Sequence, residues 1–105
     1  MDAKKIREQL KIFIKRIKKE YRPEKVILFG SFAKGQSTAY SDVDILVIAN
    51  KFKDIDTYKR FSQLYDLGKD LDVDINAFGF TSEETKKLYY LTTLRDALQT
   101  GKVIG

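Results

Sequence analysis

Asp42 and Asp44 stand at the start of an apolar run, in the segment SDVDILVIA that ends at Ala49. Side chains two residues apart on a strand share one face, so the two carboxylates are expected to project together. Like charges placed this close repel one another and call for a cation or hydrogen-bond donors nearby. Mg²⁺ suits such a pair, because it prefers a few carboxylates supplemented by phosphate oxygens and water.

A second pair of aspartates occurs in LDVDINAF, residues 71–78, where apolar and polar residues alternate. This alternation predicts a strand with Asp72 and Asp74 on one face. If this strand neighbours the one that carries Asp42 and Asp44, three or four carboxylates would converge on one patch. Zinc is not expected there, because the chain contains no His and no Cys.

Gly30 and Ser31 close an earlier apolar run, ten residues before Asp42. Glycine lets a backbone approach a ligand closely, and N–H groups at the start of a helical turn favour an anion. Lys34 adds a positive charge nearby. Taken alone, the GS pair fits an ordinary turn and the D-x-D pair fits a solvated strand start. Their combination predicts a site for a phosphate-bearing ligand and a divalent cation.

The elements that would position these residues follow from the spacing of the apolar residues. We expect helices over 2–20, 54–68 and 81–101, and strands over 25–29, 42–49 and 71–78, with a turn-rich connector over 31–41. The last helix is expected to open with a capping box from Thr81 to Glu84 and to break near Thr92. The middle helix is expected to turn Phe61, Leu64 and Tyr65 inward.

The predicted core takes one side of each strand and the apolar stripes of the helices. Its members are expected to be Ile14, Ile27, Phe29, Val43, Ile45, Val47, Leu64, Val73, Ile75 and Leu94. The expected fold class is therefore α/β, with a small mixed sheet of three or four strands covered by helices mainly on one face.

Composition limits the chemistry. A chain of 105 residues is expected to form a single domain over 1–105. Without His or Cys, catalysis would depend on carboxylates, hydroxyls, lysines or an oxygen-bound metal.

No apolar stretch could span a bilayer and no secretory signal is evident, so a cytoplasmic protein with no membrane partner is expected. The net charge is +5, and half of the Lys and Arg residues lie in the first 25 positions, which gives the first helix a basic face.

Gly30-Ser31, ten residues and then Asp42-x-Asp44 resemble the signature of the polymerase-β-like nucleotidyltransferase superfamily. The longer segment GSFAKGQSTAYSDVDILV is similar to that of the minimal, MNT-type branch, and VDIN resembles the third carboxylate strand of that branch. The segment from TSEE to the end of the chain is similar to its C-terminal helix. The resemblance implies the nucleotidyltransferase fold and an activity that moves a nucleoside monophosphate from a triphosphate, expected to be ATP, to an acceptor hydroxyl with release of pyrophosphate.

The resemblance also implies roles for individual residues. Those expected to bind the nucleotide are Gly30, Ser31, Lys34 and Ser41. Those expected to be catalytic and to hold two Mg²⁺ ions are Asp42, Asp44 and Asp74. The family pattern of an Asp followed by apolar residues fits DINAF better than DVDI, so Asp74 is preferred to Asp72 as the third carboxylate. Lys34 stands where the family usually has Arg, and a Lys lacks the bidentate contact that Arg makes with phosphate.

The resemblance further suggests a partner. Larger members carry an additional domain for the acceptor, whereas minimal members pair with a small helical HEPN protein as antitoxin and toxin, and some transfer AMP to a tyrosine of that toxin. Because this chain lacks the His of the toxin's ribonuclease motif, it is cast as the antitoxin. The alternatives are a catalytically inactive antitoxin that acts by binding, and a nucleic-acid-binding module that uses the basic first helix. Few aromatic residues interleave with those basic residues, which disfavours nucleic acid.

The clustered aspartates lead to a first prediction about metal binding. Mg²⁺ or Mn²⁺ should bind weakly to the protein alone and more tightly when a nucleoside triphosphate supplies further oxygen ligands. Calorimetric titration of the metal with and without nucleotide measures the difference. Equal metal affinity in the two titrations would contradict the prediction.

Overall fold

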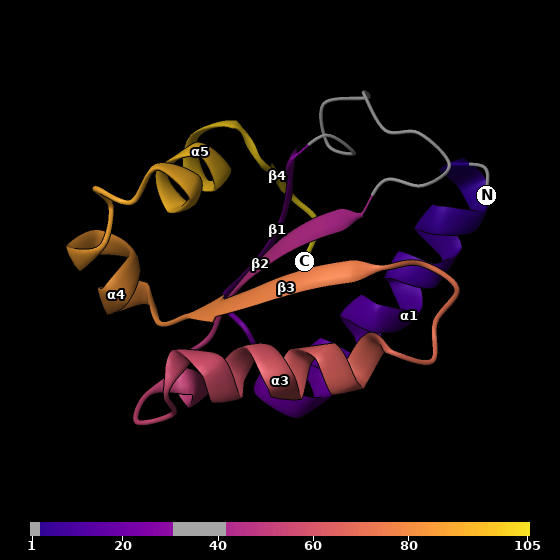
Figure 1. Ribbon diagram of the computed structural model, residues 1–105, viewed down its shortest axis with the longest axis horizontal. Helices are drawn as coiled ribbons and strands as arrows, with labels where there is room; N and C mark the ends of the chain where they lie inside the picture. The colour runs from indigo at the N-terminus through magenta and orange to yellow at the C-terminus, as the bar shows by residue number, and fades with distance from the viewer. Residues whose placement is uncertain (1–2, 31–41) are drawn as a thin grey trace.

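The structure is a computed structural model that describes residues 3–30 and 42–105. Its elements in chain order are α1 (Ala3–Tyr21), β1 (Lys25–Phe29), β2 (Val43–Ile48), the 3-10 turn η1 (Asn50–Phe52), α3 (Thr57–Gly68), β3 (Ile75–Phe80), α4 (Ser82–Lys87), α5 (Thr92–Thr100) and β4 (Lys102–Val103) (Figure 1). None of the helices in these ranges is long and apolar enough to cross a membrane.

The four strands form one sheet in the order β3-β2-β1-β4. β1 pairs antiparallel with both β2 and β4, whereas β2 and β3 run parallel. Parallel neighbours need a crossover connection, which η1 and α3 supply here. The expected α/β fold with a small mixed sheet flanked by helices is therefore confirmed.

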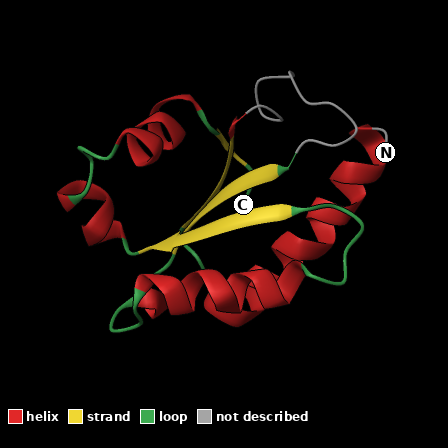
Figure 2. Cartoon of the chain, in the orientation of Figure 1, coloured by secondary structure: helices red, strands yellow, loops and turns green. Residues whose placement is uncertain are grey.

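Helices cover both faces of the sheet, and not mainly one face as predicted (Figure 2). On one face α1 and α3 pack on the side chains of Val43, Ile45 and Val47, which are fully buried. On the other face α5 packs on Leu46 and its neighbours through a second, smaller cluster of buried apolar residues. The predicted core residues are buried except for Ile14, which is partly buried, but they divide between these two layers.

The first helix forms as its apolar spacing predicts. Phe13 and Ile17 on its inner face are fully buried, and the outer face is basic. The helix ends before Arg22, which takes a positive φ of 47° immediately ahead of Pro23. Proline disfavours right-handed helical geometry in the residue before it, so this stop follows from the sequence.

Several predicted details of the remaining elements are wrong: α3 begins at Thr57 and not at residue 54, and β3 ends at Phe80 and not at residue 78. Leu64 is buried as predicted and Phe61 is partly buried, but Tyr65 is 55% exposed, because α3 turns Arg60 and Gly68 toward the core beside Leu64. The third strand begins at Ile75, four residues later than expected, because the preceding apolar residues 71 and 73 pack in the core without joining the ladder. The capping box at Thr81 is confirmed, and the break falls between α4 and α5.

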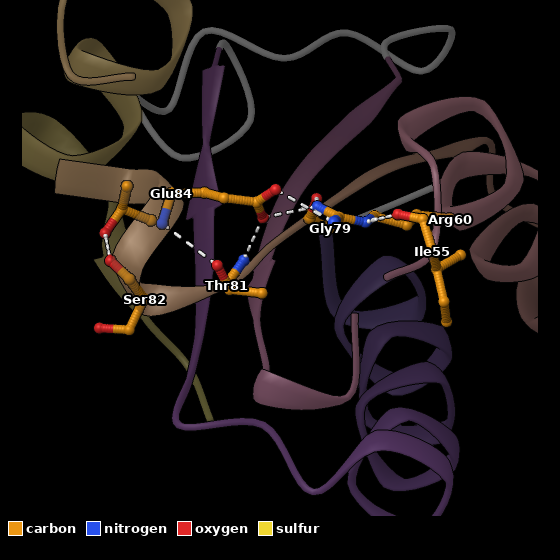
Figure 3. A network of polar contacts seen from close by, with 7 residues as sticks. Ile55, Arg60, Gly79, Thr81, Ser82 and Glu84 are labelled. Carbon is orange, nitrogen blue, oxygen red and sulfur yellow. Dashed lines mark hydrogen bonds and ion pairs between the residues drawn. The ribbon is translucent and has the colours of Figure 1, made fainter. Parts of the chain in front are cut away.

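A buried arginine ties α3 to β3 and α4 (Figure 3). Arg60 is 5% exposed, and its Nη1 and Nη2 donate to the two carboxylate oxygens of Glu84 at 2.6 and 3.0 Å. Its Nε donates to the Ile55 carbonyl at 2.6 Å and Nη1 also donates to the Gly79 carbonyl at 3.2 Å. Glu84 in turn accepts the Thr81 N–H at 2.7 Å as part of the capping box. The fork geometry of arginine suits this task, since it satisfies two carbonyls and a carboxylate together.

This network predicts a pH-dependent loss of stability in Glu84→Gln. The hydrogen bond from Arg60 holds the pKa of Glu84 below its ordinary value. A lowered folded-state pKa stabilises the protein at neutral pH, and that stabilisation is lost as pH falls through the folded-state pKa. At pH 7 the substitution should therefore cost about 1.5–3 kcal/mol, the usual range for a charged hydrogen bond. Urea unfolding at pH 7 and at pH 3–4 measures both effects.

Glu83→Gln is the matched control for this experiment. Glu83 is the adjacent residue, but its side chain is 74% exposed and pairs only with Lys87 one helical turn away. Its unfolding midpoint should stay near that of the unmodified protein. Equal shifts in the two variants would show that the Arg60 network does not stabilise the fold.

Candidate active site

The register of β2 and β3 brings three polar side chains together. Asp44 and Asn76 are direct partners in this parallel pair. The Nδ2 group of Asn76 donates to Asp44 Oδ1 at 3.3 Å and to Asp42 Oδ2 at 3.2 Å. Because both oxygens contact the same nitrogen, they lie at most about 6.5 Å apart. The predicted convergence of Asp42 and Asp44 is therefore observed.

Asn76 is a site residue that the sequence reasoning did not select. It lies two residues beyond Asp74, and alternation along the predicted strand placed it on the same face as the aspartates. Its position on that face is the signal that the sequence offers, although a neutral amide lacks the charge that marks a metal ligand. An amide can donate through its nitrogen or, after rotation of the side chain, present its oxygen to a cation.

Asp74 and Asp72 take different positions. Both are exposed and both precede β3, so neither lies within the strand. The carbonyl of Asp74 accepts the Val43 N–H at 2.9 Å, which places its backbone beside the start of β2. The N–H of Asp72 donates to the Gln9 side chain on α1 at 3.1 Å. The backbone of Asp74 therefore lies next to the strand that carries Asp44, whereas that of Asp72 contacts α1. The role of Asp74 as third carboxylate stays a prediction.

Gly30 closes the site at the end of β1. Its φ is +77°, a conformation that glycine adopts without strain. A Cβ added there would collide with the carboxylate of Asp44 and force that side chain to move, so Gly30 lies in direct contact with Asp44. The other residues predicted to bind nucleotide, Ser31, Lys34 and Ser41, lie outside the described residues.

The side chains at this end of the sheet fit only part of the ligand set of a metal ion. Among the described residues, no three Asp, Glu, His or Cys side chains are grouped to hold an ion. Asp42 and Asp44 offer carboxylate oxygens, and the Asn76 amide would add an oxygen only after rotation of its side chain, a set that suits Mg²⁺ better than zinc. Two carboxylates fit a Mg²⁺ ion that brings phosphate oxygens and water with it, and they do not make a self-sufficient protein cage.

Comparison with known proteins places the chain in a family whose reaction is consistent with this fold and with the paired carboxylates. It belongs to the nucleotidyltransferase domain family, whose pattern matches residues 10–99. It is 35% identical over 101 residues to a protein of Methanocaldococcus jannaschii that is named as a candidate protein adenylyltransferase, and the match covers 90% of this chain and 93% of that protein. The chain is thus a nucleotidyltransferase-family protein, as the spacing of its motifs indicated.

Solved structures support the same fold. A candidate nucleotidyltransferase from Sulfolobus solfataricus superposes with a TM-score of 0.62 at 16% identity, over 98% of this chain and 87% of that chain. A chain from a toxin–antitoxin structure with AMP-PNP superposes with a TM-score of 0.60 at 23% identity, over 87% of this chain and 68% of that chain. At these identities the likeness concerns the fold.

The contact between Gly30 and Asp44 predicts that Gly30→Ala damages both stability and nucleotide binding. The positive φ should cost about 1–2 kcal/mol for alanine, and the new methyl group must push the Asp44 carboxylate aside. Urea unfolding measures the first effect, and calorimetric titration with Mg²⁺ and ATP measures the second.

Gly30→Asn separates the two causes. Asparagine tolerates positive φ better than alanine but carries the same Cβ. It should recover part of the lost stability and still weaken nucleotide binding. Normal nucleotide binding by both variants would contradict the placement of Gly30 at the site.

Proposed function

We propose that this protein transfers AMP from ATP to a hydroxyl group of a partner protein. The observation that carries the proposal is the placement of Asp42 and Asp44 around the Asn76 amide at the ends of adjacent strands. Membership of the nucleotidyltransferase family supports the reaction class, and the name of the Methanocaldococcus jannaschii relative supports a protein as acceptor.

The reaction is a substitution at the α-phosphorus of ATP. The acceptor oxygen forms a bond to this phosphorus, the bond to the bridging oxygen of pyrophosphate breaks, and pyrophosphate leaves with that electron pair. The acceptor hydroxyl gives up its proton to solvent water as the new bond to phosphorus forms. A bound Mg²⁺ would supply positive charge that makes both the attacking and the leaving oxygen better suited to the exchange.

The residues of this chain contribute position and charge. Asp42 and Asp44 would hold Mg²⁺ together with Asp74 at the entry to β3 as the third carboxylate, and Asp72 is the alternative to Asp74. The Asn76 amide, fixed by the β2–β3 ladder, orients both carboxylates toward one point. Rigid strands are a suitable frame, because such sites work only when their ligands are held closely in place.

The partner we propose is a small helical HEPN-type toxin, with this chain as its MNT-type antitoxin. The motif resemblance motivates this pairing, and the shared fold with the toxin–antitoxin chain is consistent with it. The acceptor would be a hydroxyl on that toxin. Nucleotide transfer onto the partner would distinguish this role from neutralisation by binding alone.

Asp44→Asn tests the catalytic role directly. Asparagine keeps the shape of the side chain and an oxygen that can accept the Asn76 hydrogen bond, but it removes one negative charge. Loss of an outer partner of a metal site costs about 10- to 100-fold, so loss of a direct carboxylate should reduce transfer by at least about a hundredfold. The fold should persist, because a repulsion between like charges is relieved.

The assay mixes the protein, the purified product of the neighbouring gene, Mg²⁺ and labelled nucleotide, and follows label on the partner by mass spectrometry. Asp66→Asn is the matched control, since Asp66 is an exposed residue of α3 that pairs with Lys69. It should transfer AMP normally. A tight complex without transfer from ATP, GTP, CTP or UTP would refute the transferase and favour the binding-only antitoxin.

A further inference from the structure

The outer face of α1 carries a row of positive charges. Its basic residues recur every three or four positions, which places them within about a quarter of the circumference of the helix. At a rise of about 1.5 Å per residue the row extends over about 21 Å. All of its members are exposed to solvent. This α1 basic row consists of Lys4, Arg7, Lys11, Lys15 and Lys18.

The charges of the α1 basic row are not used to hold the fold. None of its members forms an ion pair with another described residue. Arg16, which lies outside the row, does have a structural partner, since it pairs with Asp70 at 2.7 Å. The helix is fixed to the sheet by its inner face, where Phe13 and Ile17 are fully buried. The row is therefore available to an anionic ligand.

The residue types of the row distinguish between anionic ligands. Protein–protein interfaces are depleted in Lys and enriched in aromatic residues. The row contains four lysines and one arginine, and the aromatic residues of α1, Phe13 and Tyr21, are both buried. Single-stranded nucleic acid is usually held in a groove where its bases stack on aromatic side chains, and this helix face presents no such ring. Phosphate groups on the outside of a duplex need only exposed basic side chains.

We propose that the α1 basic row binds double-stranded DNA through its phosphate groups. The major groove of B-form DNA, about 12 Å wide, admits an α-helix and is bordered by phosphates on both sides. The major groove of an RNA duplex is too deep and narrow for this. Because phosphate contacts carry no sequence information, the binding is independent of base sequence.

The arrangement of the elements leaves this face open to a long, rigid ligand. α1 lies at one side of the molecule, whereas α4 and α5 lie at the other (Figure 1). The inference is separate from the proposed function, because the carboxylates of Asp42 and Asp44 would repel a phosphate backbone. DNA binding therefore requires neither a nucleotide nor a metal ion.

The experiment measures the fluorescence anisotropy of a labelled DNA duplex during titration with the protein. EDTA is present, so that no metal ion can connect Asp42 and Asp44 to a phosphate. The titration is repeated between about 50 and 200 mM salt, because each neutralised phosphate adds about −0.9 to the slope of log K against log salt concentration. The slope should reach about −4.5 if the whole row contacts phosphates.

Two variants with the same net charge test the position of the binding surface. Lys11→Gln/Lys15→Gln removes two charges from the middle of the row, and Lys86→Gln/Arg95→Gln removes two from exposed residues of α4 and α5. Each pair of substitutions lowers the net charge from +5 to +3, because two positive charges are lost.

The α1 variant should reduce the magnitude of the salt slope by about 1.8 and weaken binding in 0.1 M salt by at least about tenfold. The control variant should keep the slope of the unmodified protein. Both should keep the urea unfolding midpoint, since all four residues are exposed.

Several outcomes would overturn the inference. Equal losses in the two variants would show that DNA responds to net charge and not to the α1 basic row. Absence of binding at about 50 mM salt, or tighter binding of a single strand or an RNA duplex of equal length, would exclude double-stranded DNA as the ligand. If DNA does not bind but the α1 variant weakens the complex with the product of the neighbouring gene, the row is a protein interface. None of these results changes the expectation for AMP transfer.

Discussion

The parallel pairing of β2 with β3 is the constraint on which the site depends. In this register Asp44 lies beside Asn76, and a slip of one residue would place an apolar side chain there and turn the amide to the opposite face. Parallel pairing is not fixed by a tight turn, because the chain must cross over through α3 between the two strands. Arg60 secures that crossover, since it holds the Gly79 carbonyl at the far end of β3 and the Glu84 carboxylate on α4. A contact remote from the carboxylates thus helps to hold β3, and with it Asn76, beside Asp44.

Among the described residues, the two carboxylates are only partly compensated by their neighbours. Full charges at most about 6.5 Å apart repel by at least roughly 0.6–2.6 kcal/mol for an effective dielectric constant between 80 and 20. The Asn76 amide contributes two long hydrogen bonds, of 3.2 and 3.3 Å, whose net contribution is of similar size at best. Because the amide is neutral, it offsets the repulsion without removing the negative charge. The pair therefore keeps the charge that attracts a cation while its geometry is held.

Local patterns in the sequence predicted the elements well, and long-range partners explain what they missed. The bounds of β1, the stop at Arg22 and the capping box at Thr81 depend on residues close in sequence, and each is confirmed. The inward turn of Arg60 was missed, because hydropathy gives no reason to bury an arginine whose partner lies 24 residues away. The strand β4 has two residues and exists only because the edge of β1 is available to pair with it. At the site, spacing predicted the meeting of Asp42 and Asp44, whereas the contribution of Asn76 required the register.

Charged groups play two different roles in this chain. Arg60 and Glu84 form an ion pair and hydrogen-bond surrounding carbonyl and N–H groups, so they hold α3, β3 and α4 together. Asp42 and Asp44 form no ion pair with any described Lys or Arg, although the chain carries a net charge of +5. Among the described residues, only the Asn76 amide offsets the repulsion between the two carboxylates. Their closeness is unfavourable in the protein alone, and a bound cation would relieve it.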